Sequence, residues 1–271
     1  MNNPTTALII STYNKPEELE ITLKSVLAQS VMPDEVIIAD DGSKVPTQLL
    51  VEQYQGIFKI PFIHVWHEDN GFRLAEIRNK ALAKASTDYI IQIDGDIIIH
   101  KHFIKDHLAF AKKGTFVRAS RSYINEKISD QILWHNKVNL SYLSRGITNR
   151  LSAIHLPVAW KLFEHNYKKS EPYEIHGCNM AFWRDDAIMV NGYNENFVGW
   201  GPEDKEFVVR MLNKGYKKRF IKMGKYKSGN TMKHTKNLPF RADDISRFFA
   251  MLLFRKDNDR ISFYISKQQY F

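Results

Sequence analysis

Residues 88–96 read Asp-Tyr-Ile-Ile-Gln-Ile-Asp-Gly-Asp, and this stretch decides the fold. The apolar run from residue 89 to residue 93 predicts a buried strand. Asp94 and Asp96 follow at its carboxyl end, which is the edge where ligands bind in open α/β sheets. Gly95 has no side chain, so a ligand can approach the backbone between them. Paired carboxylates suit a hard divalent cation such as Mg²⁺ or Mn²⁺, and the alternative is a simple Asp-Gly turn.

Apolar strands and amphipathic helices alternate along the chain on both sides of this stretch. Strands are expected at residues 7–10, 36–39, 60–65, 89–93, 115–119, 178–183 and 219–223. Helices are expected at residues 16–27, 74–85, 184–190 and 203–212, the first with proline and glutamates in its first turn. Strands that alternate with helices predict an α/β fold with a mostly parallel, doubly wound sheet.

The composition indicates a folded, basic protein. The 271 residues suffice for one large α/β domain, or for one domain with a sizeable appendage. Cys178 is the only cysteine, so no intramolecular disulfide can form, which is compatible with the reducing cytosol. We see no signal peptide and no apolar run as long as a membrane span, and we expect a cytoplasmic protein. The formal net charge of +9 suits an anionic partner: a nucleotide, a nucleic acid or an anionic membrane surface.

Two regions leave two interpretations open. Residues 121–174 mix basic, aromatic and polar side chains without a clear period, and they form either a mobile segment over the ligand site or an insertion packed on the core. Near the C-terminus, apolar residues at helical spacing lie beside basic ones: Ile245, Phe248, Phe249, Leu252 and Leu253 beside Arg247, Arg255 and Lys256. This pattern predicts a helix packed on the core, and the alternative is a basic amphipathic helix that rests on the inner face of the cytoplasmic membrane.

Four polar motifs lie where a predicted strand ends or a predicted helix begins. They are Thr12-Tyr13-Asn14, Asp40-Asp41-Gly42-Ser43, Asp94-Gly95-Asp96 and Trp200-Gly201-Pro202-Glu203-Asp204. In this order they resemble the GT-A glycosyltransferases, nucleotide-sugar enzymes with a DxD metal motif. The first half resembles the large bacterial family of inverting transferases, and the second half is similar to the galactosyltransferase-like C-terminal region. Chondroitin-polymerase-type transferase domains combine both halves and carry a stretch comparable to Arg73 through Arg78-Asn79.

The resemblance covers roughly residues 5 to 235 and implies a fold and a division of the chain. The fold is the Rossmann-like GT-A fold, a mostly parallel sheet flanked by helices. The glycosyltransferase domain spans residues 1–235, with a nucleotide-binding half at about 1–100 and an acceptor and catalytic half at about 101–235. Residues 236–271 form a C-terminal helical extension.

The resemblance assigns the nucleotide-sugar donor to the first half of the chain. Asp40 can accept a hydrogen bond from the uracil N3–H, and Thr12 and Tyr13 can line the base and ribose. Asp41 supports these residues without contacting the base. Arg78 can face the diphosphate as a fixed cation. The full set of expected donor-binding residues is Thr12, Tyr13, Asn14, Asp40, Asp41, Arg73, Arg78, Asp94 and Gly95.

The resemblance also implies a metal site, with Mn²⁺ or Mg²⁺ as the cofactor. Asp96 coordinates the metal directly, and Asp94 has a ribose or water-mediated metal contact. Similar galactosyltransferases add a histidine from a later loop, and His234 occupies the matching position. His176 is the competing candidate.

The last motif is expected to carry the catalytic base and the sugar-binding loop. An acceptor hydroxyl is a poor nucleophile and needs a base within hydrogen-bonding reach. Asp204, at the start of a helix, is assigned as this base, while Trp200, Gly201 and Glu203 bind the donor sugar or the acceptor. One base opposite one leaving group implies inversion at the anomeric carbon. The alternative is that Glu203 and Asp204 only complement the helix dipole.

These features predict a metal-dependent inverting glycosyltransferase. It would transfer galactose or N-acetylgalactosamine from a UDP-sugar to a glycan acceptor in bacterial surface polysaccharide synthesis. The sugar rests only on the similarity of the 200–204 loop, where Pro202 and the following Lys205 depart from many relatives. A nucleotidyltransferase or a dehydrogenase is an alternative, but residues 11–15 lack the glycines that both need. A nucleic-acid-binding protein is a further alternative, although the basic residues are spread out and Asp-rich loops repel phosphate without a metal.

Overall fold

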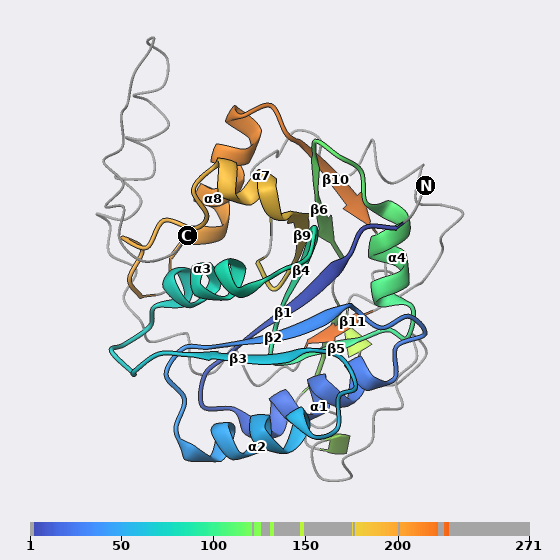
Figure 1. Ribbon diagram of the computed structural model, residues 1–271, viewed down its shortest axis with the longest axis vertical. Coiled ribbons are helices and arrows are strands. Elements are labelled where there is room, and N and C mark those ends of the chain that lie inside the picture. The colour runs from blue at the N-terminus through green and yellow to red at the C-terminus, as the bar shows by residue number, and fades with distance from the viewer. Residues whose placement is uncertain are drawn as a thin grey trace.

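The computed structural model describes residues 3–120, 122–125, 131–132, 147–148, 175, 177–199, 201–221 and 225–227. Their main feature is a seven-stranded sheet with helices on both faces (Figure 1). Its strands are β1 (Thr6–Thr12), β2 (Glu35–Asp40), β3 (Phe62–Trp66), β4 (Tyr89–Asp94), β6 (Thr115–Ala119), β9 (Asn179–Trp183) and β10 (Lys217–Ile221). In space they follow the order β10-β6-β9-β4-β1-β2-β3, so the strand that carries Asp94 is central.

Most neighbouring strands in this sheet are parallel. β1 pairs in parallel with β2 and β4, β2 with β3, and β6 with β10. β9 differs, since it pairs antiparallel with both β4 and β6. The predicted α/β fold with a mostly parallel sheet is therefore confirmed, with one antiparallel strand inserted next to β4.

The strands are buried because helices cover both faces of the sheet. Side chains of a strand alternate between its faces. In β1, Leu8 and Ile10 pack with α1 (Pro16–Leu27), α2 (Val45–Gln55) and α4 (Phe103–Phe110). Ala7 and Ile9 pack on the other face with α3 (Leu74–Lys84), α7 (Arg184–Met189) and α8 (Glu203–Asn213). This two-sided cover is the predicted doubly wound arrangement.

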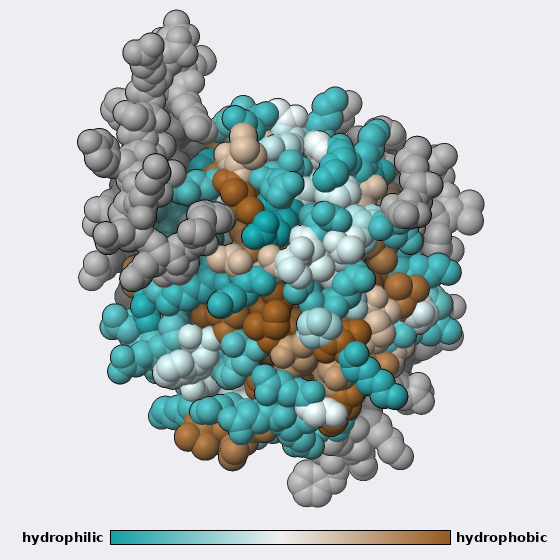
Figure 2. Space-filling model, in the orientation of Figure 1, coloured by the Kyte–Doolittle hydropathy of each residue, from teal (hydrophilic) through white to brown (hydrophobic). Residues whose placement is uncertain are grey.

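The helical periodicity predicts α1, α3, α7 and α8, and the structure confirms all four. It does not predict α2, because the apolar side chains of this helix do not form one buried stripe. Val45 and Leu49 are 62% and 59% exposed, whereas Thr47, Val51 and Tyr54 are buried. Hydrophobic residues also gather on the surface in Figure 2 near the position of α2. The short helix α4 is likewise absent from the predictions.

Two strands, β3 and β10, are shifted along the chain from their predicted ranges, whereas β1 and β2 extend beyond theirs at both ends. β3 was expected at residues 60–65 and spans Phe62–Trp66, so the strand begins after Pro61. β10 was expected at residues 219–223 and spans Lys217–Ile221. It lies at the edge of the sheet, where basic side chains are common. The apolar pattern that defined the prediction therefore missed its first two residues.

A second, smaller sheet lies beyond the carboxyl end of β4. It contains β5 (Ile97–Ile99), β7 (Ser122–Ile124), β8 (Ile147–Thr148) and β11 (Lys225–Lys227), in the order β5-β11-β7-β8. Since β5 begins directly after Asp96, the Asp94-Gly95-Asp96 turn lies at the junction of the two sheets.

Within the described ranges, the structure contains no helix that is both long enough and apolar enough to cross a bilayer. The predicted C-terminal helix, most of residues 121–174, Trp200, His176 and His234 lie outside the described residues. The interpretations that concern them stay predictions.

Candidate active site

Three of the polar motifs meet at one edge of the large sheet. The register pairs Thr12 with Asp40 across β1 and β2, and Ser11 with Asp94 across β1 and β4. Because these strands are parallel, their carboxyl ends form one continuous row. The backbone N–H of Gly95 donates to the Ser11 carbonyl oxygen at 2.7 Å. A side chain at this position would lie 3.1 Å from that oxygen, so the turn already needs glycine to pack on β1.

The loops after β1 and β2 are joined by direct hydrogen bonds. Asn14, which has a positive φ of 49°, donates its backbone N–H to the Ser43 hydroxyl at 2.8 Å. Its side-chain oxygen accepts the backbone N–H of Lys44, also at 2.8 Å. Tyr13 donates its hydroxyl to Asp69 at 2.9 Å and remains 42% exposed. The first loop thus presents an accessible aromatic ring at the edge, and the role of Tyr13 beside a base or ribose stays a prediction.

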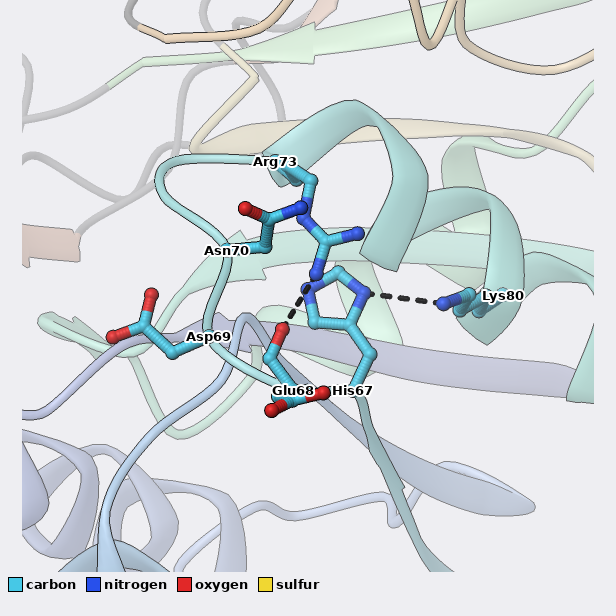
Figure 3. A pocket seen from close by; sticks show the side chains of 6 residues that line it. All are labelled: His67, Glu68, Asp69, Asn70, Arg73 and Lys80. Carbon is cyan, nitrogen blue, oxygen red and sulfur yellow. Dashed lines mark hydrogen bonds between the residues drawn. The ribbon is translucent and has the colours of Figure 1, made fainter.

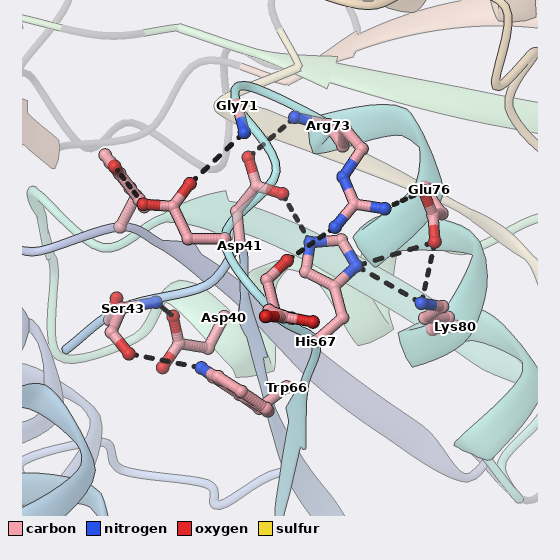
Figure 4. A network of polar contacts seen from close by, with 12 residues as sticks. Asp40, Asp41, Ser43, Trp66, His67, Gly71, Arg73, Glu76 and Lys80 are labelled. Atoms are coloured by element: carbon pink, nitrogen blue, oxygen red, sulfur yellow. Dashed lines mark hydrogen bonds and ion pairs between the residues drawn. The ribbon is translucent and has the colours of Figure 1, made fainter. Parts of the chain in front are cut away.

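Asp40 and Asp41 both use their carboxylates within the protein (Figure 4). Asp40 is fully buried, accepts the Ser43 N–H at 2.9 Å and shares a hydrogen bond with His64 at 3.0 Å. Asp41 accepts the backbone N–H of Arg73 at 2.9 Å, and its other oxygen lies 2.7 Å from Nε2 of His67. Burial raises the pKa of Asp41, although these two partners oppose the rise. The predicted contact of Asp40 with uracil would require that this carboxylate become accessible, and it stays a prediction.

His67 connects Asp41 to α3, the helix that begins directly after Arg73 and carries Arg78. Nδ1 of His67 lies 3.2 Å from Nζ of Lys80, and Nε2 lies 2.7 Å from Oδ1 of Asp41, so both ring nitrogens have a polar partner. Glu76 pairs with Lys80 at 2.7 Å and with Arg73 at 2.9 Å. This network fixes the start of α3 against the end of β2.

A polar cavity of about 510 Å³ opens beside this network (Figure 3). The residues that line it are His67, Glu68, Asp69, Asn70, Arg73 and Lys80. The side chain of Arg73 donates a hydrogen bond to the carbonyl oxygen of Glu68 at 2.5 Å and therefore stabilises the loop after β3. Arg73, which is predicted to bind the nucleotide-sugar donor, thus lines an open, charged surface next to Asp41.

The second half of the site is a cluster of carboxylates around Arg78. The side chain of Arg78 is only 2% exposed, and one of its terminal nitrogens lies 2.8 Å from Oδ1 of Asp204. The same nitrogen lies 3.3 Å from Glu203, and the other terminal nitrogen lies 3.4 Å from Asp94. Burial by itself lowers the pKa of Arg78, but the surrounding carboxylates raise it further than burial lowers it. One buried cation therefore joins residues of α3, β4 and α8 that are far apart in the sequence.

Asp204 is held from both sides. Arg78 binds Oδ1, and the backbone N–H of Gly177 donates to Oδ2 at 2.8 Å. A β-carbon on Gly177 would lie only 2.0 Å from Oδ2, so a larger residue at this position would require the Asp204 carboxylate to shift. Burial raises the pKa of Asp204, and the charge of Arg78 opposes that rise. Burial together with the charge of Asp204 raises the pKa of Glu203 to about 8. Burial thus raises the pKa of both adjacent carboxyls, and the charge of Arg78 opposes the rise in each.

The Asp94-Gly95-Asp96 turn has the donor chemistry that a divalent cation requires. Asp96 is 8% exposed and lies at the junction between the two sheets. Mg²⁺ is usually held by one or two carboxylates together with substrate phosphates, so these two residues fit such an ion. Across the described ranges, no three His, Cys, Asp or Glu residues are arranged to hold a metal ion. His234, the further predicted ligand, lies outside these ranges and stays a prediction.

The loop before α8 is anchored to the first half of the site. The backbone N–H of Gly199, which has a φ of 87°, donates to the Phe72 carbonyl oxygen at 2.9 Å. Gly201 packs near Phe197, since a side chain there would lie 3.4 Å from that ring. Trp200 between them is outside the described residues. The loop that precedes Glu203 and Asp204 therefore contacts the segment before Arg73.

Sequence patterns did not identify three residues that the structure places beside Asp204: Gln92, Gly177 and Tyr193. Gln92 gave one usable signal, because it is a polar residue within an otherwise apolar strand. Gly177 and Tyr193 gave none, since a glycine before a strand and a tyrosine after a turn are ordinary features. Their role depends on contacts between residues 85 or more positions apart.

Comparisons with known proteins agree with this geometry. The family described as Glycosyl transferase family 2 matches residues 7–187, and the family described as the N-terminal domain of galactosyltransferase matches residues 160–235. A chondroitin synthase of Pasteurella multocida (strain Pm70) is 28% identical over 225 residues, covering 77% of this chain and 23% of that protein. The chain therefore spans less than a quarter of the length of this relative.

Solved structures share the fold at low sequence identity. TarS of S. aureus in complex with UDP-GlcNAc has a TM-score of 0.64 at 18% identity and covers 94% of this chain and 68% of that chain. GalNAc-T7 with UDP, GalNAc and Mn²⁺ has a TM-score of 0.63 at 16% identity and covers 84% and 44% of the two chains. The expected GT-A fold is confirmed.

Proposed function

The chain belongs to glycosyl transferase family 2, and on this basis we propose that it is a metal-dependent inverting glycosyltransferase. The donor is a UDP-sugar, UDP-galactose or UDP-N-acetylgalactosamine. The acceptor is a glycan, and the product is part of a bacterial surface polysaccharide.

The observation that carries this proposal is the cluster in which Arg78 holds Asp204 and Glu203 next to Asp94. A base must lie near the metal motif, because the acceptor hydroxyl attacks the carbon whose leaving group is the diphosphate. Asp204 is joined through one guanidinium to the strand end that carries Asp94. Its side chain remains 22% exposed, so a substrate hydroxyl can reach it.

The choice of donor and cofactor is supported by the related proteins. TarS was solved with UDP-GlcNAc and GalNAc-T7 with UDP, GalNAc and Mn²⁺. The chondroitin synthase supports a polysaccharide acceptor. The match of residues 160–235 to a galactosyltransferase domain supports a galactose-type sugar.

In this proposal the reaction is a single displacement. Asp204 accepts the proton of the acceptor hydroxyl while that oxygen forms a bond to the anomeric carbon. The bond between that carbon and the diphosphate oxygen breaks, and UDP leaves with the electron pair. Because the base and the leaving group lie on opposite sides of the carbon, the configuration inverts. A divalent ion held by Asp96, with His234 as the further predicted ligand, would stabilise the negative charge of the departing diphosphate.

The raised pKa of Asp204 suits a general base. A base accepts a proton better as its pKa approaches the working pH, provided that it is still ionised. Burial raises the pKa of Asp204, and the charge of Arg78 opposes that rise and favours the ionised form. Arg78 would have to leave these carboxylates to bind the diphosphate, and its present contacts support a role in holding the base.

The test is a panel of nucleotide sugars mixed with the protein and Mn²⁺, in which nucleotide release is measured with and without EDTA. We expect release from one UDP-sugar that EDTA abolishes and that both Asp96→Ala and Asp204→Asn remove. Release that survives EDTA would refute the metal dependence. Full activity of Asp204→Asn would refute the assignment of the base, and absence of both nucleotide and metal binding would refute the function.

A further inference from the structure

We propose that Gln92 is a positioning residue for the base. Its side-chain amide fixes the Gly177 backbone and the Tyr193 hydroxyl, and through them both oxygens of the Asp204 carboxylate. This inference rests on the proposed function, because it concerns the residue that the proposal names as the base.

Gln92 is a polar side chain in the middle of the sheet. It lies in β4, is 1% exposed, and has apolar neighbours, Ile91 and Ile93, on each side along the strand. Since strand side chains alternate, Gln92 points to the same face as Ile90, toward α3 and α8. A buried amide is costly unless its donor and its acceptor are both satisfied.

Both ends of the Gln92 amide are satisfied by residues next to the base. Its nitrogen donates to the Gly177 carbonyl oxygen at 2.8 Å, and its oxygen accepts the Tyr193 hydroxyl at 2.9 Å. A carbonyl can only accept, so the orientation of the amide is determined.

The first connection leads to Oδ2 of Asp204. Glycine adopts many backbone conformations, so a glycine that must aim its N–H needs an external constraint. Gln92 supplies it at the carbonyl of Gly177, while the N–H of the same residue donates to Asp204 at 2.8 Å. The strand that carries the metal motif thereby sets the direction of a donor to the base.

The second connection leads to Oδ1 of Asp204. The Tyr193 ring lies 5.5 Å from the guanidinium carbon of Arg78 and stacks on Phe207 of α8 with centroids 4.6 Å apart. Asn79 binds both the N–H and the carbonyl oxygen of Tyr193, at 2.7 and 2.8 Å. Tyr193 therefore supports the guanidinium that binds Oδ1. Loss of the Gln92 amide removes one hydrogen bond from the support of each oxygen.

The size of the effect follows from the geometry that a base requires. A displacement of about 1 Å at a reacting group costs about 10²-fold in rate. We expect Gln92→Met, which keeps the length of the side chain and removes both hydrogen bonds, to lower kcat about 10- to 100-fold. The KM for the UDP-sugar and the affinity for UDP should not change, because the donor loops are held by other contacts.

The deciding experiment is a double-mutant cycle between Gln92→Met and Asp204→Asn, measured as kcat for transfer in single-turnover assays at enzyme concentrations high enough to quantify the residual rate of Asp204→Asn. If Gln92 acts through Asp204, Gln92→Met costs nothing further once Asp204 has been replaced. Gln48→Met is the matched control, since Gln48 binds only Glu52 on the exposed surface of α2. If Gln92→Met does not fold, Tyr193→Phe replaces it in the cycle, because it removes only the hydroxyl, and we expect it to lower kcat about 3- to 10-fold.

The outcomes separate this inference from the proposed function. A wild-type protein without transfer activity, or a fully active Asp204→Asn, overturns both. With an active wild type and an Asp204→Asn variant reduced to a small residual rate, unchanged kcat in Gln92→Met overturns the positioning role alone. A loss that multiplies with that of Asp204→Asn, or that accompanies an equal loss of UDP affinity, indicates a general structural role and overturns it as well.

Discussion

Gly177→Ala is the substitution whose effect the structure determines most directly. The added methyl carbon would lie 2.0 Å from Oδ2 and 2.1 Å from Oδ1 of Asp204, whereas ordinary van der Waals contacts begin at 3.4 Å. The carboxylate must therefore move by about 1.4 Å. It cannot do so and keep the 2.8 Å hydrogen bonds from both Gly177 and Arg78.

The expected loss is large and confined to the chemical step. A displacement of this size corresponds to a fall in kcat of about 100-fold, or about 2.7 kcal/mol in the activation barrier. The donor loops do not contact Gly177 in any described interaction, so the KM for the UDP-sugar should remain within about twofold of wild type.

Steady-state transfer assays with the UDP-sugar that the nucleotide-sugar panel selects measure kcat and KM, and a UDP titration measures the affinity for UDP. Gly56→Ala is the control, because a methyl group at this helix end lies 3.6 Å from its nearest neighbour and the backbone is helical. A kcat of Gly177→Ala within threefold of wild type would refute the close contact between the catalytic carboxylate of Asp204 and Gly177. A rise in KM without a fall in kcat would refute its role as a base.

Three further predictions concern the other charged groups of the site. Arg78→Met leaves three carboxylates without their shared cation and should lower the free energy of unfolding by about 3–5 kcal/mol. Urea denaturation measures this change, and an unchanged denaturation midpoint would contradict the buried cluster. Burial raises the pKa of Glu203 from 4.5 to about 8, so its protonated form contributes stability that is lost as the pH rises through about 8. Glu203→Gln should therefore become progressively more stable than wild type between pH 5 and pH 8, which exposed Glu17→Gln should not. Asp96→Ala should weaken Mn²⁺ binding in the presence of UDP by at least about 10-fold in calorimetry, whereas Asp88→Ala at the opposite end of β4 should leave it unchanged.

Much of the fold could be predicted because β1, β2 and β4 are continuous apolar runs that end in polar motifs. Their parallel pairing follows from the helices between them, and the row of strand ends follows from the pairing. The antiparallel β9 could not be predicted in this way, because an apolar run of five residues does not reveal its direction. Helix α2 was missed because its exposed Val45 and Leu49 obscure the buried face.

The candidate site could be predicted at the level of motifs and not at the level of contacts. Asp94, Glu203 and Asp204 follow from their positions after a strand and at the start of a helix. Arg78 lies among these three carboxylates, and its expected contact with a diphosphate stays a prediction. The contacts through which Gln92 and Gly177 hold Asp204 could not be predicted. Gln92 and Gly177 meet only when β4 and β9 pair antiparallel.

The central claim is a single displacement with Asp204 as the base, and the configuration of the product tests it most directly. The sugar of UDP-galactose or UDP-N-acetylgalactosamine is α-linked, and NMR of the product formed by the wild-type protein reports the anomeric configuration. We predict a β-linked product, or β-sugar first when water is the acceptor, and no product from Asp204→Asn. An α-linked product, or a β-linked product formed equally well by Asp204→Asn, would contradict the proposed mechanism.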